Sequence, residues 1–140
     1  MAHNRTAGLF YLMLAILYMA GIYRLSAIPG DAGAAGLGGI IAWTPPAIQN
    51  LLHIPLFGIL AWLWYRTLAG WITRLPAVYV LVFIVTAGFG VLDEWHQLTI
   101  PGRYASLTDI ALNTLGTVVA LWLIARSGRL AHQPVTQSTE

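Results

Sequence analysis

The sequence contains no cysteine and no lysine, and charged residues make up only 9% of it. The missing cysteines exclude a disulfide framework and any metal site with thiolate ligands. Soluble domains carry about a quarter charged residues, so a chain this poor in charge does not fit that class. A formal net charge of only +2 also gives no basic patch for nucleic acid. Apolar side chains dominate instead, at 58% of the 140 residues.

Four apolar segments are long enough to cross a bilayer as helices, since a hydrocarbon core of about 30 Å requires about 20 residues. They extend from about residue 7 to 23, 46 to 70, 76 to 97 and 107 to 125. We therefore predict an all-α integral membrane bundle of four transmembrane helices within residues 1–126, followed by a polar, disordered tail over residues 127–140. The first segment could instead be a secretory signal sequence.

Prolines and polar residues mark where the predicted helices begin and bend. Thr44 followed by two prolines is typical of a helix N-terminus, because proline is tolerated in the first turn. Ser106 resembles the first residue of a capping box, with Asp109 three residues later. Pro55 lies inside the second predicted helix, where it removes one backbone hydrogen bond and should bend the helix.

The positions of the arginines predict the orientation in the membrane. With four spans, the N-terminus, the second loop and the C-terminus share one side, which carries five arginines against two on the other. The five are Arg5, Arg66, Arg74, Arg126 and Arg129, and the two are Arg24 and Arg103. Because cytoplasmic loops are enriched in basic residues, we predict a multi-pass protein of the cell membrane with both termini in the cytoplasm.

Polar side chains gather at the outward ends of the last two predicted helices. Charged groups at membrane depth are costly unless they are paired, and by default they mark a functional site. Two helix faces carry small residues deep in the bilayer and polar residues nearer the surface: Ala87, Gly90, Glu94 and Gln97 on the third helix, and Asp109, Asn113, Gly116 and Ala120 on the fourth. Because small residues let helices approach closely, we expect these two faces to pack against each other.

Three further residues complete the predicted site, namely Asp93, His53 and Arg103. Arg103 is the one basic residue near the three acids, which are Asp93, Glu94 and Asp109. We expect these acids to hold Arg103 while it contacts an anionic ligand. Glu94 and His53 are the candidates for proton exchange or catalysis. The predicted ligand-binding residues are Arg103, Asp93, Glu94, Gln97, Asp109, Asn113 and His53.

No motif in the sequence predicts a cofactor or a dedicated metal site. A histidine on an apolar helix is more often a hydrogen-bonded core residue than a ligand. His53 could still ligate a divalent cation together with Asp93, Glu94 or Asp109, whose atoms are of suitable type. Their spacing matches no known metal motif, so we predict that no metal is bound. A divalent cation at these residues is the weaker of the two hypotheses. Ser106 is better explained as a helix cap than as a nucleophile, because there is no GxSxG motif.

The polar residues as a set resemble the signature of the VanZ-like family of small integral membrane proteins. The resemblance is carried by Leu92-Asp93-Glu94-Trp95-His96-Gln97, by the turn Pro101-Gly102-Arg103, and by Asp109, Asn113 and Gly116. His53 resembles the histidine of the family's Asp-Lys-x-x-His motif, although Gln49 and Asn50 stand where the family usually has Asp-Lys. After the first helix the family often has a Ser-Ser-Gln stretch, of which this sequence matches only one residue, Ser26. These departures put any role of an Asp-Lys pair in doubt.

The resemblance implies a cell-envelope membrane protein, since the family's namesake gives low-level resistance to the antibiotic teicoplanin. We expect an outward-facing pocket that binds a lipid-linked or cell-wall-related anionic group and influences susceptibility to teicoplanin-type glycopeptides. One alternative is a membrane enzyme that hydrolyses or modifies a lipid headgroup. Another is a non-catalytic packing subunit of a membrane complex, in which the polar residues clamp the helices together. The expected partners are membrane lipids, a lipid-linked envelope precursor, and a second copy or another protein, but no nucleic acid.

Overall fold

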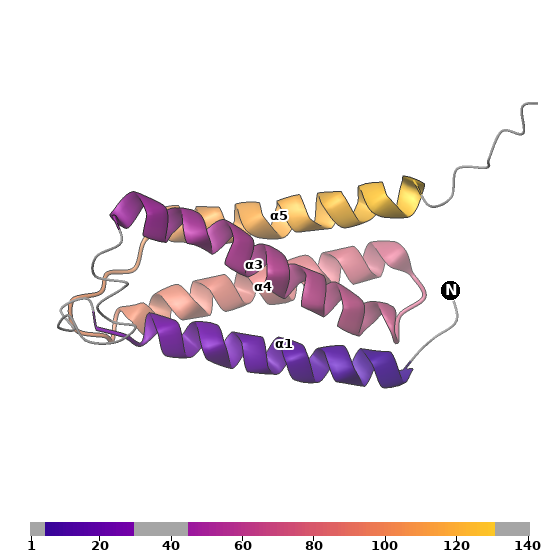
Figure 1. Cartoon of the computed structure of the whole chain (residues 1–140), viewed down its shortest axis with the longest axis horizontal. Helices are drawn as coiled ribbons and strands as arrows, with labels where there is room; N and C mark the ends of the chain where they lie inside the picture. The colour runs from indigo at the N-terminus through magenta and orange to yellow at the C-terminus, as the bar shows by residue number, and fades with distance from the viewer. Residues whose placement is uncertain (1–4, 30–44, 131–140) are drawn as a thin grey trace, which may run out of the picture.

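The computed structural model describes residues 5–29 and 45–130, and within them the chain forms four long helices. They are α1 (Arg5–Ser26), α3 (Pro46–Ala69), α4 (Leu75–Gln97) and α5 (Leu107–Leu130). The helices run side by side in one bundle (Figure 1). All four are long and apolar enough to cross a membrane. The prediction of an all-helical bundle with four membrane spans is therefore confirmed.

Two helix ends differ from the predictions. The residue at the N-cap of α3 is Pro45, and no side chain caps this helix, so the prediction of a threonine cap was wrong. Pro45 precedes another proline, which forces it into an extended conformation (ψ 139°), and the helix can begin only at Pro46. Thr44 itself lies outside the described residues. At the other end of the chain, α5 continues beyond Arg126 to Leu130.

The helix α3 packs against each of the other three helices. Its buried residues Phe57 and Leu60 meet Ile22 of α1, and its Ala61 joins two buried valines of α4. Many other large apolar side chains point outward, among them Leu17, which is 61% exposed, and Val80, which is 58% exposed. An outer surface of this kind suits lipid, and the membrane-spanning helices therefore contact the bilayer.

Small residues set the spacing between α3 and α5. Gly116 of α5 is buried against the backbone of α3, and a Cβ atom on it would lie 2.9 Å from Cα of Ile54. The neighbouring Gly58 of α3 faces the Gly116 carbonyl, which a Cβ atom on Gly58 would meet at 3.5 Å. The expectation that Gly116 packs against α4 was wrong, because its closest contacts are to the Ile54 backbone of α3, next to Gly58.

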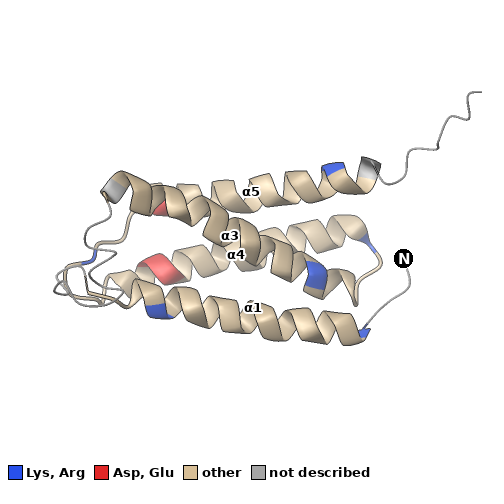
Figure 2. Cartoon of the chain, in the orientation of Figure 1, with Lys and Arg blue, Asp and Glu red and all other residues tan. Residues whose placement is uncertain are grey.

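The charged residues of the described segments lie toward the two ends of the bundle (Figure 2). Asp93 and Glu94 are in the last turns of α4, and Asp109 is in the first turn of α5, so all three acids share one end. Arg24, in the last turn of α1, lies at the same end. The opposite end carries Arg66, which is in the last turn of α3. The arrangement brings the predicted site residues to one end of the bundle.

Candidate functional site

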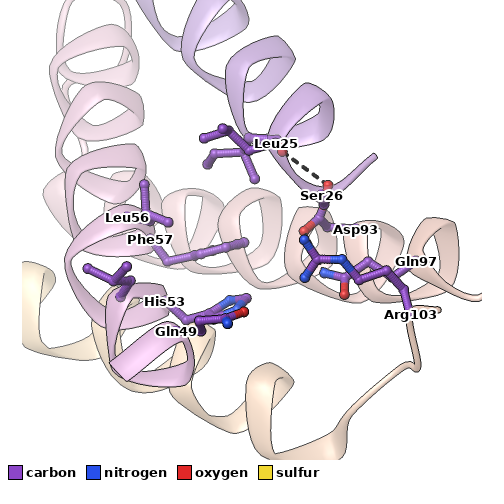
Figure 3. A pocket seen from close by; sticks show the side chains of 11 residues that line it. Leu25, Ser26, Gln49, His53, Leu56, Phe57, Asp93, Gln97 and Arg103 are labelled. Carbon is purple, nitrogen blue, oxygen red and sulfur yellow. Dashed lines mark hydrogen bonds between the residues drawn. The ribbon is translucent and has the colours of Figure 1, made fainter. Parts of the chain in front are cut away.

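A pocket of about 210 Å³ lies between α1, α3 and α4 at the end that carries the acids (Figure 3). Its walls are mainly apolar and are formed by Ile22, Leu25, Leu52, Leu56 and Phe57. Its polar lining consists of Ser26, Gln49, His53, Asp93, Gln97 and Arg103. Figure 3 shows Arg103, Gln97 and Asp93 grouped together near Ser26, with His53 and Gln49 on α3 at another side of the pocket.

Asp93 connects α4 to the end of α1. Its side chain is only 2% exposed, and its Oδ1 atom accepts a hydrogen bond of 2.6 Å from the hydroxyl of Ser26. The side-chain amide of Gln97, one turn further along α4, lies 3.5 Å from the other carboxylate oxygen. Because a charge-assisted hydrogen bond is stronger than a neutral one, Ser26 stabilises the buried carboxylate. Ser26 was not among the predicted site residues.

Glu94 connects the end of α4 to the start of α5. This side chain is 1% exposed, and its Oε2 atom accepts a 2.8 Å hydrogen bond from the backbone N–H of Ser106. Its Oε1 atom accepts a weaker bond of 3.3 Å from Gln97. The hydroxyl of Ser106 caps α5 by accepting from the backbone N–H of Asp109 at 3.3 Å, as predicted. In a full capping box the side chain of Asp109 would in turn accept from the backbone N–H of Ser106. That N–H donates to Glu94 instead, so the second bond of the box is not formed.

His53 connects α3 to α5 through the buried side chain of Asn113. The distance between Nδ1 of His53 and Oδ1 of Asn113 is 2.8 Å. An amide oxygen can only accept, so Nδ1 is the donor in this arrangement, and in the neutral ring Nε2 then has the lone pair. The Asn113 Nδ2 atom is buried and has no hydrogen-bond partner within the described segments. The same holds for Oδ1 of Asp109.

Arg103 projects into the pocket from the tight turn between α4 and α5. Its backbone N–H bonds to the carbonyl of Ile100 at 3.1 Å, and Gly102 has a φ of 71°. Proline at the second position and glycine with positive φ at the third define a type II turn. The Nε atom of Arg103 donates to the carbonyl of Ile28, just beyond α1, over 2.9 Å.

The surroundings of Arg103 differ from the expectation that the acids hold it. Among residues 5–29 and 45–130, no ion pair joins its guanidinium to Asp93, Glu94 or Asp109. The first two carboxylates take their hydrogen bonds from Ser26, Gln97 and the Ser106 backbone instead. A backbone carbonyl, rather than a carboxylate, therefore orients the guanidinium.

The seven predicted site residues fall into two groups. Four of them line the pocket: His53, Asp93, Gln97 and Arg103. The other three, Glu94, Asp109 and Asn113, are buried beside His53 and are not part of the pocket lining. One atom each from His53, Glu94 and Asp109 lie within 4.8 Å of one another. The structure thus contains an accessible polar patch and, next to it, a buried polar cluster.

The fold and these polar groups define a multi-pass membrane protein of four helices with a buried polar network at one end of the bundle. A comparison with protein families matches residues 7–128 to the VanZ/LLP1 family. The chain therefore belongs to this family, which confirms the resemblance seen in its motifs. No curated protein and no solved structure matches the chain.

Proposed function

We propose that the pocket binds the anionic headgroup of a membrane lipid, with a lipid-linked precursor of the cell envelope as the expected ligand. The observation that carries this proposal is the position of Arg103, a cation without a carboxylate partner in the described segments, in a pocket with mainly apolar walls. Phosphate and carboxylate groups are the ligands that an arginine fork binds best. The apolar walls suit the part of the hydrocarbon chain that adjoins the headgroup.

The hydrogen bonds already made by Arg103 leave its outer nitrogens for a ligand. Within the described segments only Nε is bonded to the protein, so the two terminal nitrogens of the guanidinium can bind two oxygens of one phosphate. Because the pocket is mainly apolar, water competes weakly for these donors. Asp93 and Gln97 lie next to Arg103 and offer oxygen acceptors for hydroxyl groups, such as those of a sugar attached to the phosphate.

Replacing Arg103 with alanine is expected to weaken binding of a polyprenyl phosphate by at least about tenfold, since a hydrogen bond to a charged group contributes about 1.5–3 kcal/mol. Lysine keeps the charge but not the fork, so Arg103→Lys should fall between wild type and alanine. Binding would be measured by native mass spectrometry of the full chain titrated with polyprenyl phosphate. Arg24→Ala removes an exposed arginine at the same end of the bundle and serves as the matched control. An equal affinity for wild type and Arg103→Ala would contradict the proposal.

Binding of a cell-wall precursor would connect this protein to the action of glycopeptide antibiotics. We propose that the chain influences susceptibility to teicoplanin-type glycopeptides by occupying such a lipid. Expression of wild type, but not of Arg103→Ala at the same level, should then change the inhibitory concentration of teicoplanin.

The proposal places both chain termini in the cytoplasm and the pocket at the outer face. It is supported by the arginines, which are fewer at the end of the bundle that carries the acids. The chain has no cysteine, so a single introduced cysteine reports its own side of the membrane. Tyr104, which is 84% exposed, lies at the pocket end, and the exposed Thr73 lies in the loop at the opposite end.

A membrane-impermeant maleimide is expected to label Tyr104→Cys in intact cells and Thr73→Cys only after the cells are permeabilised. Neither substitution changes an arginine, so the charge distribution that sets the topology is preserved. Labelling of Thr73→Cys in intact cells, with Tyr104→Cys protected, would show the opposite orientation.

A further inference from the structure

Glu94 and Asp109 are two buried carboxylates that lie close together, with His53 beside them and no arginine paired to either among the described residues. Their side chains are 1% and 9% exposed, and each offers an oxygen to a group of atoms that lie within 4.8 Å of one another. Glu94 is also in the last turn of α4, where the negative end of the helix dipole adds to the negative potential. Two negative charges at membrane depth require a positive counter-charge or a shared proton.

The buried cluster leaves an acceptor atom of Asp109 unused. Oδ1 of Asp109 is buried and has no hydrogen-bond partner in the described part of the chain. From the described residues, each Glu94 oxygen accepts one hydrogen bond, which leaves a lone pair on each for another ligand. A buried carboxylate oxygen without any partner is rare, because losing its hydration is costly. The cluster therefore calls for an electropositive group, which a metal ion, a shared proton or a protonated His53 can supply.

The hydrogen bond made by His53 leaves a nitrogen of its ring free as a third ligand. Nδ1 bonds to the Asn113 oxygen at 2.8 Å, so in the neutral ring Nε2 has the lone pair that a metal ion would take. Metal-binding histidines typically donate their other N–H to an oxygen in this way, which fixes the tautomer and the ring orientation. Asn113, which is 1% exposed, holds the ring from α5.

We propose that His53, Glu94 and Asp109 bind a divalent transition-metal ion such as Zn²⁺ or Mn²⁺. Two carboxylates neutralise the charge of the ion, and an imidazole ligand favours these metals over Mg²⁺ and Ca²⁺. Bonds of about 2.0–2.2 Å to the metal require the three ligand atoms to move inward by up to about 1 Å. Three protein ligands leave a coordination position for water or another ligand. The ligands come from three helices, which explains why their spacing in the sequence matches no metal motif.

The metal site does not depend on lipid binding by Arg103, and the two proposals can fail separately. The full-length protein would be purified in detergent, stripped with EDTA and titrated with ZnCl₂ by calorimetry, with the bound metal counted by mass spectrometry. Wild type should bind one Zn²⁺ per chain, and Asp109→Asn should bind it at least about tenfold more weakly, since it loses a charged ligand. Arg103→Ala, which removes the proposed lipid contact, should bind Zn²⁺ as wild type does.

Asp93→Asn provides the matched control for this titration. Asp93 is as deeply buried as Glu94 and adjacent to it, but its hydrogen bonds go to Ser26 and Gln97, outside the proposed metal site. This variant should keep the affinity of wild type. Histidines outside the site are present in every variant, so binding to them alone would give the same affinity in all of them and would overturn the proposal.

A second measurement on the wild type guards against a variant that does not fold. A ligand that binds only the folded state raises the unfolding temperature. Excess Zn²⁺ should therefore raise the thermal midpoint of the stripped wild-type protein, and the same concentration of Mg²⁺ should not. The absence of a Zn²⁺-dependent shift would overturn the metal site and leave a shared proton or a protonated His53 as the means by which the two carboxylates coexist.

Discussion

Replacing Gly116 with alanine is expected to separate α5 from α3 and to destabilise the protein by about 3 kcal/mol, the upper end of the usual cost of overpacking a core. The added Cβ atom would lie 2.9 Å from Cα and 3.0 Å from the carbonyl carbon of Ile54, and closer still to its oxygen. These are backbone atoms of a helix, so no side-chain rotation can relieve the clash. The helices must move apart, which also removes the contacts around this point.

Two other glycines provide controls for this substitution. Gly88 and Gly21 have no heavy atom within 4 Å of the position of an added Cβ, and alanine stabilises a helix by up to about 1 kcal/mol relative to glycine. Gly88→Ala and Gly21→Ala should therefore be neutral or slightly stabilising. Unfolding would be followed by tryptophan fluorescence in detergent during heating. If Gly116→Ala and Gly88→Ala had equal midpoints, the close approach of α5 to α3 would be refuted.

Replacing Glu94 with alanine is expected to cost about 2–4 kcal/mol, because each buried donor left without a partner costs about 1–3 kcal/mol. Two donors lose their acceptor, the backbone N–H of Ser106 and the side-chain amide of Gln97. The cavity left by the side chain adds to the loss. Removal of one of two neighbouring carboxylates acts in the opposite direction, since it relieves their repulsion. We expect the lost hydrogen bonds and packing to outweigh that relief.

Glu94→Gln separates the contribution of the acceptor from that of the charge. Glutamine has nearly the same volume and keeps one oxygen for the N–H of Ser106, while it removes the negative charge. This variant should lose less than about 1 kcal/mol in a denaturant titration, well below the overpacking and cavity losses of core substitutions. Equal losses for the alanine and glutamine variants would show that the charge, rather than the acceptor and the volume, stabilises this end of the bundle.

The sequence was sufficient to predict the spans and the burial of four polar residues on α4 and α5. The length of an apolar run determines whether it can cross a bilayer, and all four predicted runs are helices here. Helical periodicity placed Glu94 and Gln97 on one face of α4 and Asp109 and Asn113 on one face of α5, and all four residues are buried. The periodicity of a helix depends only on its own sequence, which explains this agreement.

The partners of these residues could not be predicted, because they depend on how all the helices are rotated and spaced. Gly116 meets α3 rather than α4, and Asp93 finds its partner in Ser26 on α1. Arg103 bonds to the carbonyl of Ile28, and a backbone acceptor has no signature in the sequence. The stacking of His96 on Tyr23, with ring centroids 3.8 Å apart, was missed for the same reason.

The rim of the pocket has a consequence for how a ligand reaches Arg103. Leu25 and Leu52 line the pocket and are also 41% and 50% exposed on the outer surface of the bundle, where hydrocarbon lies. A lipid bound as proposed would thus enter the pocket sideways from its leaflet, without passing through water. Occupancy then follows the mole fraction of that lipid in the leaflet rather than its aqueous concentration. Even a weak preference over bulk phospholipid is enough to fill the pocket when the preferred lipid is abundant.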